Sequence, residues 1–316
     1  MPLEIDYSDL HVHKLMLHDG IRCAAFRRAL AELVTPDSAV LDVGAGTSLL
    51  SVFAAQSGAR IVYAVERTQT AELAERIVSD NRLSDRIRVI KEDMESVELP
   101  EQVDVIVSEW LGGYGIDENL LPVIVRARDR WLKPGGIMIP STVSSWIAPA
   151  YDAELEKDIQ FWTQEPYGVD LAAIAEKTSG HLLCCRNNVK AEHLLADPQQ
   201  MWEIDCTAVT FEQAAGIFEA KLDFTCTKQA RCNALAAWFE AHLSKDNVLS
   251  NRPSDQWTHW GRWVFPIGAC LDVDEGSRIA VHFSVKPEGA GRSRAIWQVN
   301  IGDYSFSSED VTSLTR

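Results

Sequence analysis

The apolar residues of the first 140 positions form short continuous runs that alternate with segments of helical spacing. We expect strands at 40–43, 61–65, 87–90, 103–108 and 137–139, and helices at 20–33, 49–57, 70–80 and 120–131. Continuous apolar strands separated by helices are typical of a parallel sheet that is covered on both faces. The first part of the chain is therefore predicted to be a doubly wound α/β domain. The residues at 133–136, Lys-Pro-Gly-Gly, are predicted to end its last helix.

The pattern changes after Pro140. From residue 141 onward, apolar and polar residues alternate in several segments, and turn signals such as Pro-Glu-Gly at 287–289 recur. This alternation indicates antiparallel strands, packed as a barrel or a sandwich. Helical spacing at 169–196 interrupts the β pattern. We expect two domains, 1–140 and 141–316, with a helical insertion at about 167–198.

A glycine turn followed by an acid predicts a cofactor site in the first domain. Asp42, Gly44 and Gly46 lie where the first strand meets its helix, and Glu66 ends the second strand, twenty residues after Gly46. Glycines let the backbone approach a ligand, and a carboxylate in that place accepts both ribose hydroxyls. Leu49 stands where a pyrophosphate site would favour a further glycine. The turn therefore favours S-adenosylmethionine, which has no phosphates, over NAD.

A pair of glutamates supplies the candidate chemistry. Glu109 and Glu118 lie nine residues apart in the segment SEWLGGYGIDENL, directly after a predicted buried strand. Two carboxylates on one short loop can hold a planar cation from two sides, and guanidinium is the planar cation of biology. Taken separately, each glutamate is as well explained as a capping or surface acid. Asp93 and Glu95 follow the third strand, where they would either reach an adenine amino group or remain solvated turn acids.

Composition narrows these possibilities. The chain has 316 residues, of which 46% are hydrophobic and 24% charged, as in globular proteins. The formal net charge of −16 lacks the basic footprint of a general nucleic-acid binder. Acidity suits a cationic substrate through long-range steering, although solubility alone also accounts for it.

Cysteine spacing and hydropathy point to a cytoplasmic protein. The seven cysteines are scattered without a CxxC pair, so we expect neither a metal site nor a disulfide scaffold. No apolar run approaches the ~20 residues of a membrane helix, and the N-terminus has no secretory pattern. We expect no membrane partner.

Several segments together resemble the protein arginine methyltransferases over nearly the whole chain. They are the glycine turn VLDVGAGTSLLSVFAAQSGA, the double-glutamate segment SEWLGGYGIDENLL, and WTHWGRWVF with Thr258, His259 and Trp260. HKLMLHDGIR is similar to the family's N-terminal helix, and FWTQEPYGVDLAAI to the start of its dimerisation arm. The resemblance implies a Rossmann-like methyltransferase domain, a β-barrel domain and a homodimer formed through the arm.

The resemblance also implies residue roles. Glu109 and Glu118 would clamp the substrate guanidinium, and His259 would pair with Asp19 as an acid/base couple, unless His259 is simply a core histidine. Arg22 would hold the methionine carboxylate of the cofactor, and Glu66 its ribose. The other residues implied at the cofactor are His13, Met16, Asp42, Gly44, Gly46, Met94 and Glu95. Tyr7 and Trp260 would join the two glutamates at the substrate.

Three departures from the family pattern leave the acceptor open. Leu3 and Glu4 replace the first two aromatic residues of the N-terminal element, Ser48 replaces the third motif glycine, and the double-glutamate loop is richer in glycine and contains Asp117. The acceptor is then arginine in a protein or peptide, free L-arginine, or another small guanidino metabolite. Asp117 or an arginine near the barrel would be available for the α-amino and α-carboxylate groups of a free amino acid.

Two other classes remain as alternatives. One is a non-catalytic dimeric scaffold with the same fold, and the other is an NAD-binding oxidoreductase. The degree and symmetry of methylation depend on the room around the acceptor nitrogen, which the resemblance assigns in part to Met16 and Leu120.

Overall fold

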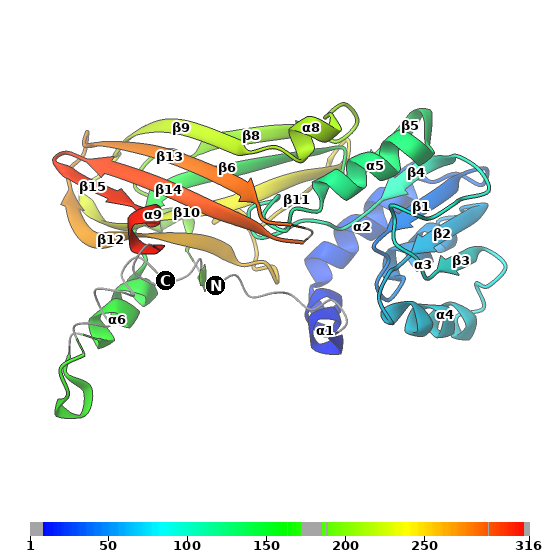
Figure 1. Ribbon diagram of the computed structural model, residues 1–316, viewed down its shortest axis with the longest axis horizontal. Coiled ribbons are helices and arrows are strands. Elements are labelled where there is room, and N and C mark those ends of the chain that lie inside the picture. The colour runs from blue at the N-terminus through cyan, green and yellow to red at the C-terminus, as the bar shows by residue number, and fades with distance from the viewer. Residues whose placement is uncertain (1–8, 163, 172–184, 188, 290, 313–316) are drawn as a thin grey trace.

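A parallel sheet forms the first part of the molecule (Figure 1). The computed structural model describes residues 9–162, 164–171, 185–187, 189–289 and 291–312. The sheet has the order β3-β2-β1-β4-β5. Its strands are β1 (Ala39–Val43), β2 (Ile61–Val65), β3 (Ile87–Ile90), β4 (Val103–Val107) and β5 (Leu132–Ile139). Every residue of β1 and β2 is buried, which explains their continuous apolar sequence.

Helices alternate with these strands as predicted. They are α1 (Leu10–His18), α2 (Gly20–Leu33), α3 (Leu49–Gln56), α4 (Thr70–Asp80) and α5 (Leu121–Trp131). From β1 the chain continues to β2 and β3 on one side of the sheet and then to β4 and β5 on the other, so the strand order reverses at β1. In sheets of this kind, ligands bind at the carboxyl ends of the strands beside such a reversal. The glycine turn after β1, Glu66 after β2 and Glu109 after β4 all lie at this edge.

The last strand of this sheet begins earlier than the expected 137–139. Helix α5 ends at Trp131, but β5 already begins at Leu132 and pairs with Val103. The next pair in the ladder is Val105 with Ile137, so residues 133–136 stand opposite Asp104 alone. The Lys-Pro-Gly-Gly segment is therefore an excursion within the strand, which Gly135 permits with a φ of +75°.

Two antiparallel sheets form the second part of the molecule and share one apolar core with the first (Figure 1). One has the order β7-β12-β10-β6-β8, with β11 paired to β10, and the other has the order β15-β14-β13-β9. The first sheet contains β6 (Thr142–Ala150), β7 (Cys185–Asn187), β8 (Gln199–Asp205), β10 (Ala230–Ser244), β11 (Asn247–Ser250) and β12 (Arg262–Val273). The second contains β9 (Phe218–Thr225), β13 (Arg278–Pro287), β14 (Ser293–Ile301) and β15 (Tyr304–Ser307). Short helices α8 (Phe211–Ala214) and α9 (Ser308–Thr312) complete this part.

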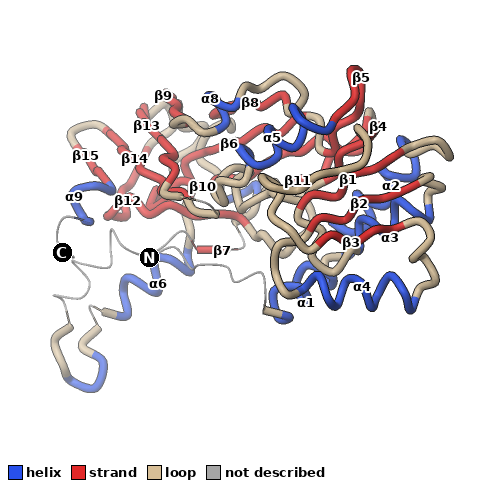
Figure 2. The backbone as a smooth tube through the Cα atoms, turned by 45° about the vertical axis from the view of Figure 1, so that its right-hand side comes forward, coloured by secondary structure: helices blue, strands red, loops and turns tan. Residues whose placement is uncertain are grey.

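Helix α6 (Ala153–Phe161) projects away from the sheets in both views (Figures 1 and 2). The helical insertion was expected at 167–198, and residues 172–184 of that range lie outside the described residues. Where the range is described, the helical expectation for 185–187 is wrong, because these residues form β7 and pair with residues 262–264 of β12. The free edge of β12 needs hydrogen-bond partners there, and that requirement outweighs the local helical spacing.

Contacts between α2 and the second part fix how the two parts meet. The Asn247 amide donates to the Ala25 carbonyl at 2.8 Å, and the Ser244 hydroxyl donates to the Glu32 carboxylate. The chain passes directly from β5 to β6 through Pro140, so the parts are also joined covalently over a short distance. In the described ranges, no helix is long and apolar enough to cross a membrane.

Candidate active site

The glycine turn after β1 has the backbone geometry of a ligand-binding turn. Gly44 and Gly46 have φ values of +70° and +52°, which glycine adopts without strain. The carboxylate of Glu66 accepts hydrogen bonds from the backbone N–H groups of Gly46 and Thr68, at 2.9 and 2.7 Å. The buried Glu66 is thus held beside the turn, at the carboxyl edge of the sheet.

Helix α1 closes over this turn. His13 is buried, and its ring lies so close to Gly46 that a Cβ on Gly46 would stand 3.0 Å from the His13 Cε1 atom. Any other residue at position 46 would push the ring away. His13 and Gly46, which are both predicted to contact the cofactor, are therefore neighbours in the structure.

Asp42 lies beneath the turn and is fully buried. Its carboxylate accepts a hydrogen bond of 2.6 Å from the Ser51 hydroxyl of α3. Burial raises the pKa of Asp42 to about 6, against the hydrogen bond from Ser51, which lowers it. In this structure Asp42 ties β1 to α3 and so stabilises the turn between them.

Glu109 is held by a buried arginine. The Arg22 Nε and Nη2 atoms both donate to the Glu109 Oε2 atom, at 3.0 and 2.8 Å, and both side chains are 8% exposed. The Leu111 N–H donates to the other carboxylate oxygen at 3.1 Å. Burial disfavours the charged form of Arg22, but the charge of Glu109 outweighs it and raises the pKa of Arg22. Glu109 therefore stabilises the charged form of Arg22.

The couple of His259 and Asp19, implied by the resemblance, is formed in the structure. The His259 Nδ1 atom lies 2.8 Å from the Asp19 Oδ2 atom, which also accepts from the His259 backbone N–H. Asp19 caps α2 by accepting from the Arg22 N–H at 3.0 Å. Burial favours the neutral form of Asp19, but these hydrogen bonds prevail and lower its pKa. The couple and the Arg22–Glu109 pair therefore meet at the start of α2.

The double-glutamate loop is held by the antiparallel part of the chain. Side chains from that part donate to successive loop carbonyls. The donors and acceptors are Trp260 Nε1 to Leu111, Asn251 Nδ2 to Gly113, Ser145 Oγ to Tyr114, and Ser293 Oγ to Asp117, at 2.6, 2.7, 2.6 and 2.6 Å. Asn251 is fully buried and also donates to the Gly261 carbonyl, so it joins the loop to the turn that bears His259. Sequence reasoning missed Asn251, Ser145 and Ser293, because nothing near them in the sequence indicates that they meet this loop.

The glycines of the loop are explained by close approach. A Cβ on Gly113 would stand 1.3 Å from the Trp263 Nε1 atom, and a Cβ on Gly112 would stand 2.2 Å from an Asp117 carboxylate oxygen. The Asp117 carboxylate accepts from the Gly113 and Tyr114 N–H groups at 3.0 and 3.1 Å. Asp117 therefore stabilises the loop itself, and this is its observed role in place of the suggested contact with an α-amino group.

The remaining residues predicted for the site differ from one another in burial and in their partners. Met94 is buried, whereas Glu95 is exposed and forms an ion pair with Arg126 of α5. The Met16 carbonyl accepts from Arg22, and Glu118 is half-buried at the far end of the loop. Trp260 is buried and packs against the rings of Phe239 and His259. Its indole N–H donates to the Leu111 carbonyl of the loop. Tyr7 lies outside the described residues.

The residues present fit S-adenosylmethionine. Glu66 offers carboxylate oxygens beside the glycine turn, and Arg22 offers a buried cation for a carboxylate. The Ser48 hydroxyl at the end of the turn is buried and has no hydrogen-bond partner. No group of His, Cys, Asp or Glu within the described ranges is arranged to hold a metal ion.

The crevice and the loop together define an α/β methyltransferase with an attached antiparallel domain, and comparison with known proteins agrees. Residues 27–139 match the family described as PRMT5 arginine-N-methyltransferase, and residues 142–308 match the arginine methyltransferase oligomerization subdomain. The chain is 36% identical over 291 residues to protein arginine N-methyltransferase 6 of Danio rerio, covering 89% of this chain and 83% of that protein. The chain therefore belongs to the protein arginine methyltransferases and is an arginine methyltransferase, which confirms the resemblance seen in the sequence.

Solved structures confirm the predicted fold class. Protein arginine methyltransferase 10 of Arabidopsis thaliana, described as uniquely open, superposes with a TM-score of 0.81 at 29% identity, covering 95% of this chain and 97% of that one. The PRMT1 enzyme–prozyme heterotetrameric complex of Trypanosoma brucei with AdoHcy gives a TM-score of 0.85 at 26% identity, covering 95% and 98%. The AdoHcy of that complex agrees with the predicted cofactor.

Ser48 gives a test of the turn geometry. It has a φ of +62° and a buried hydroxyl without a partner, so both its backbone and its side chain are unfavourable. Ser48→Gly should raise the free energy of unfolding by about 1 kcal/mol, measured by urea denaturation. The control is Ser57→Gly at the end of α3, where φ is −75° and the hydroxyl donates to the Phe53 carbonyl. That variant should lose stability, and a loss in Ser48→Gly as well would contradict the strain argument.

Asp42 gives a pH-dependent test. The folded pKa of Asp42 is about 6, above the ordinary 3.8, so between these pH values the folded state binds a proton that the unfolded state has released. The stability contributed by protonated Asp42 therefore falls as pH rises through this range. Relative to Asp42→Asn, the unsubstituted protein should lose roughly 1.3 kcal/mol of unfolding free energy between pH 5 and pH 7. Denaturation curves of both proteins at several pH values measure this difference. A difference that does not change with pH would show that Asp42 is ionised normally.

Proposed function

We propose that this enzyme transfers a methyl group from S-adenosylmethionine to a guanidino nitrogen of arginine in a protein or peptide. One observation carries the proposal: the buried pair of Arg22 and Glu109 meets the glycine turn and Glu66 at one sheet edge, with Glu118 on the same anchored loop. This supports a cofactor site and a guanidinium clamp in one crevice.

When bound, S-adenosylmethionine supplies an electrophilic methyl group on a positively charged sulfur. Glu66 would hold its ribose, and Arg22 its methionine carboxylate while still contacting Glu109. A carboxylate offers about four acceptor positions, so Glu109 can receive Arg22, the Leu111 N–H and a substrate N–H together. Met94, which is buried after β3, would pack near the adenine. Glu95 would need to leave Arg126 to reach it.

The two glutamates would act on the acceptor by positioning and charge. A guanidinium has a pKa above ~12 and delocalised lone pairs, so it is a poor nucleophile. Carboxylates on two sides would orient one terminal nitrogen toward the methyl group and keep the positive charge on the others. Positioning of this kind contributes up to roughly 7–11 kcal/mol in intramolecular models. The proton would leave to a glutamate or to His259, which Asp19 orients through Nδ1.

The acceptor is proposed to be protein arginine for two reasons. The curated relatives are protein arginine methyltransferases. Asp117, the residue suggested for the α-amino group of free arginine, is already engaged with the backbone of its own loop. Free L-arginine and other small guanidino compounds remain the second candidate, because Leu3 and Glu4 replace the first two aromatic residues of the family's N-terminal element.

We further propose that the protein acts as a cytoplasmic homodimer. The match of residues 142–308 to an oligomerization subdomain and the projection of α6 away from the sheets support self-association.

The net charge of −16 supports a separate part of the proposal, that the substrate is a cationic segment of a protein, because an acidic enzyme attracts such a segment.

Replacement of either clamp residue tests the catalytic role. Glu109→Gln and Glu118→Gln should each lower kcat by ~100-fold or more, because the amide retains shape but loses the charge that orients the guanidinium. Binding of S-adenosylhomocysteine, measured by calorimetry, should persist in both variants. The control is Glu275→Gln, an exposed residue on a distant turn that should retain full turnover. Wild-type kcat in either clamp variant would refute the clamp.

Mass spectrometry identifies the acceptor. An Arg-Gly peptide and free L-arginine, incubated side by side with enzyme and S-adenosylmethionine, should yield methylated peptide and little methylated free arginine. The mass and fragmentation of the product also give the degree and symmetry of methylation. Faster methylation of free arginine would reverse the proposed acceptor while leaving the chemistry unchanged.

A further inference from the structure

The two clamp glutamates are anchored to different parts of the molecule. Glu109 directly follows β4 and is paired with Arg22 of α2, so the methyltransferase part holds it. Glu118 lies at the other end of the loop, beside the hairpin that joins β13 to β14. This hairpin reaches from the antiparallel part to the junction of the two parts (Figure 1). The distance between the carboxylates therefore depends on contacts that join the two parts.

Two hydrogen bonds tie the residues on either side of Glu118 to this hairpin. The Ser293 hydroxyl donates to the Asp117 carbonyl at 2.6 Å, and the Asn119 Nδ2 atom donates to the Gly289 carbonyl at 2.7 Å. One donor belongs to the hairpin and the other to the loop, so the contacts run in opposite directions. We call these two hydrogen bonds the hairpin latch.

The turn that carries Glu118 is held together by hydrogen bonds within the loop. Asn119 has a φ of +51°, a conformation that asparagine tolerates better than most residues, and its N–H donates to the Ile116 carbonyl at 3.0 Å. At the start of the turn, the Asp117 carboxylate accepts from two loop N–H groups. Because these hydrogen bonds hold the turn together, the latch contributes to the position of Glu118.

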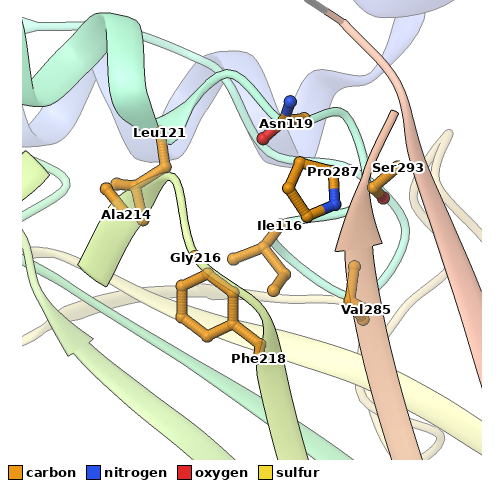
Figure 3. A pocket seen from close by; sticks show the side chains of 9 residues that line it. All are labelled: Ile116, Asn119, Leu121, Ala214, Gly216, Phe218, Val285, Pro287 and Ser293. Atoms are coloured by element: carbon orange, nitrogen blue, oxygen red, sulfur yellow. The ribbon is translucent and has the colours of Figure 1, made fainter. Parts of the chain in front are cut away.

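A small recess lies behind the turn. Ile116, Phe218, Val285 and Pro287 line it, with Asn119 and Ser293 at its rim (Figure 3). Its volume of about 10 Å³ leaves room for a single water molecule at most, far below the ~300–1,000 Å³ of typical small-molecule sites, so we do not assign it a ligand. The buried Ile116 packs at the start of the turn, and the latch adds directed contacts on either side of Glu118.

We propose that Ser293 and Asn119 are positioning residues for methyl transfer, which set Glu118 against Glu109. The inference rests on the proposed catalytic role of Glu118. A displacement of ~1 Å at a reacting group can cost on the order of 100-fold in rate, so loss of one latch hydrogen bond should be visible in turnover. The cofactor should not be affected, since neither residue contacts the glycine turn or Glu66.

Single substitutions in the full-length enzyme give the first test. Ser293→Ala should lower kcat on an Arg-Gly peptide ~10-fold with little change in the Kd of S-adenosylhomocysteine or in Tm. Ser293→Thr keeps the hydroxyl and should restore most of the activity. Asn119→Gly permits the same backbone conformation but lacks the amide, and it should resemble Ser293→Ala. The control is Ser305→Ala, an exposed serine on the neighbouring strand β15.

A double substitution shows whether Ser293 acts through Glu118. In a Glu118→Gln background, measured with a radiolabelled methyl donor, Ser293→Ala should cause no further loss of kcat. An independent loss in that background, or wild-type kcat in Ser293→Ala alone, would overturn the latch. Wild-type kcat in Glu118→Gln alone would instead overturn the proposed clamp, so failures of the two proposals are distinguishable.

Discussion

The double-glutamate loop has no strand partner along most of its length, so its buried carbonyl groups depend on side chains that arrive from the antiparallel part of the chain. Trp260, Asn251 and Ser145 each donate to one of them, at 2.6–2.7 Å. A buried polar group left without a partner costs about 1–3 kcal/mol, so the loop keeps this shape only while the antiparallel part is in place. The second domain is therefore a structural component of the site.

Helix α2 and its N-cap residue hold the charged side chains of the site in a similar way. Its N-cap, Asp19, holds His259 from the antiparallel part, and Arg22, one turn further, holds Glu109 from the parallel sheet. The backbone N–H of Arg22 also donates to Asp19, so the two ionic groups share one short segment. Buried charges are tolerated only when they are paired and hydrogen-bonded. This requirement explains why Asp19 and Glu109 are each paired with a residue of the protein itself, namely His259 and Arg22.

Features of the site encoded by neighbouring residues could be predicted from the sequence. The glycine turn, Glu66 at the end of β2 and the loop after β4 follow from strand and helix patterns together with the geometry of parallel sheets. The partners of the loop could not be predicted in this way, because Asn251 and Ser293 lie more than 130 residues from it in sequence and belong to no motif. Strand β7 was missed for a similar reason, since the edge of β12 determines it.

The unusual composition of the loop also follows from this long-range packing. Gly113 is required because the Trp263 indole occupies the space of its side chain, and Asp117 replaces a strand partner by accepting from the loop N–H groups. The Trp263 indole also packs edge-on against the buried ring of Tyr114, so the Tyr114 side chain lies against the antiparallel part. These departures from the family pattern are therefore accounted for by how the loop is supported. They supply no argument for a different acceptor, and the choice between protein and free arginine must depend on surfaces outside the loop.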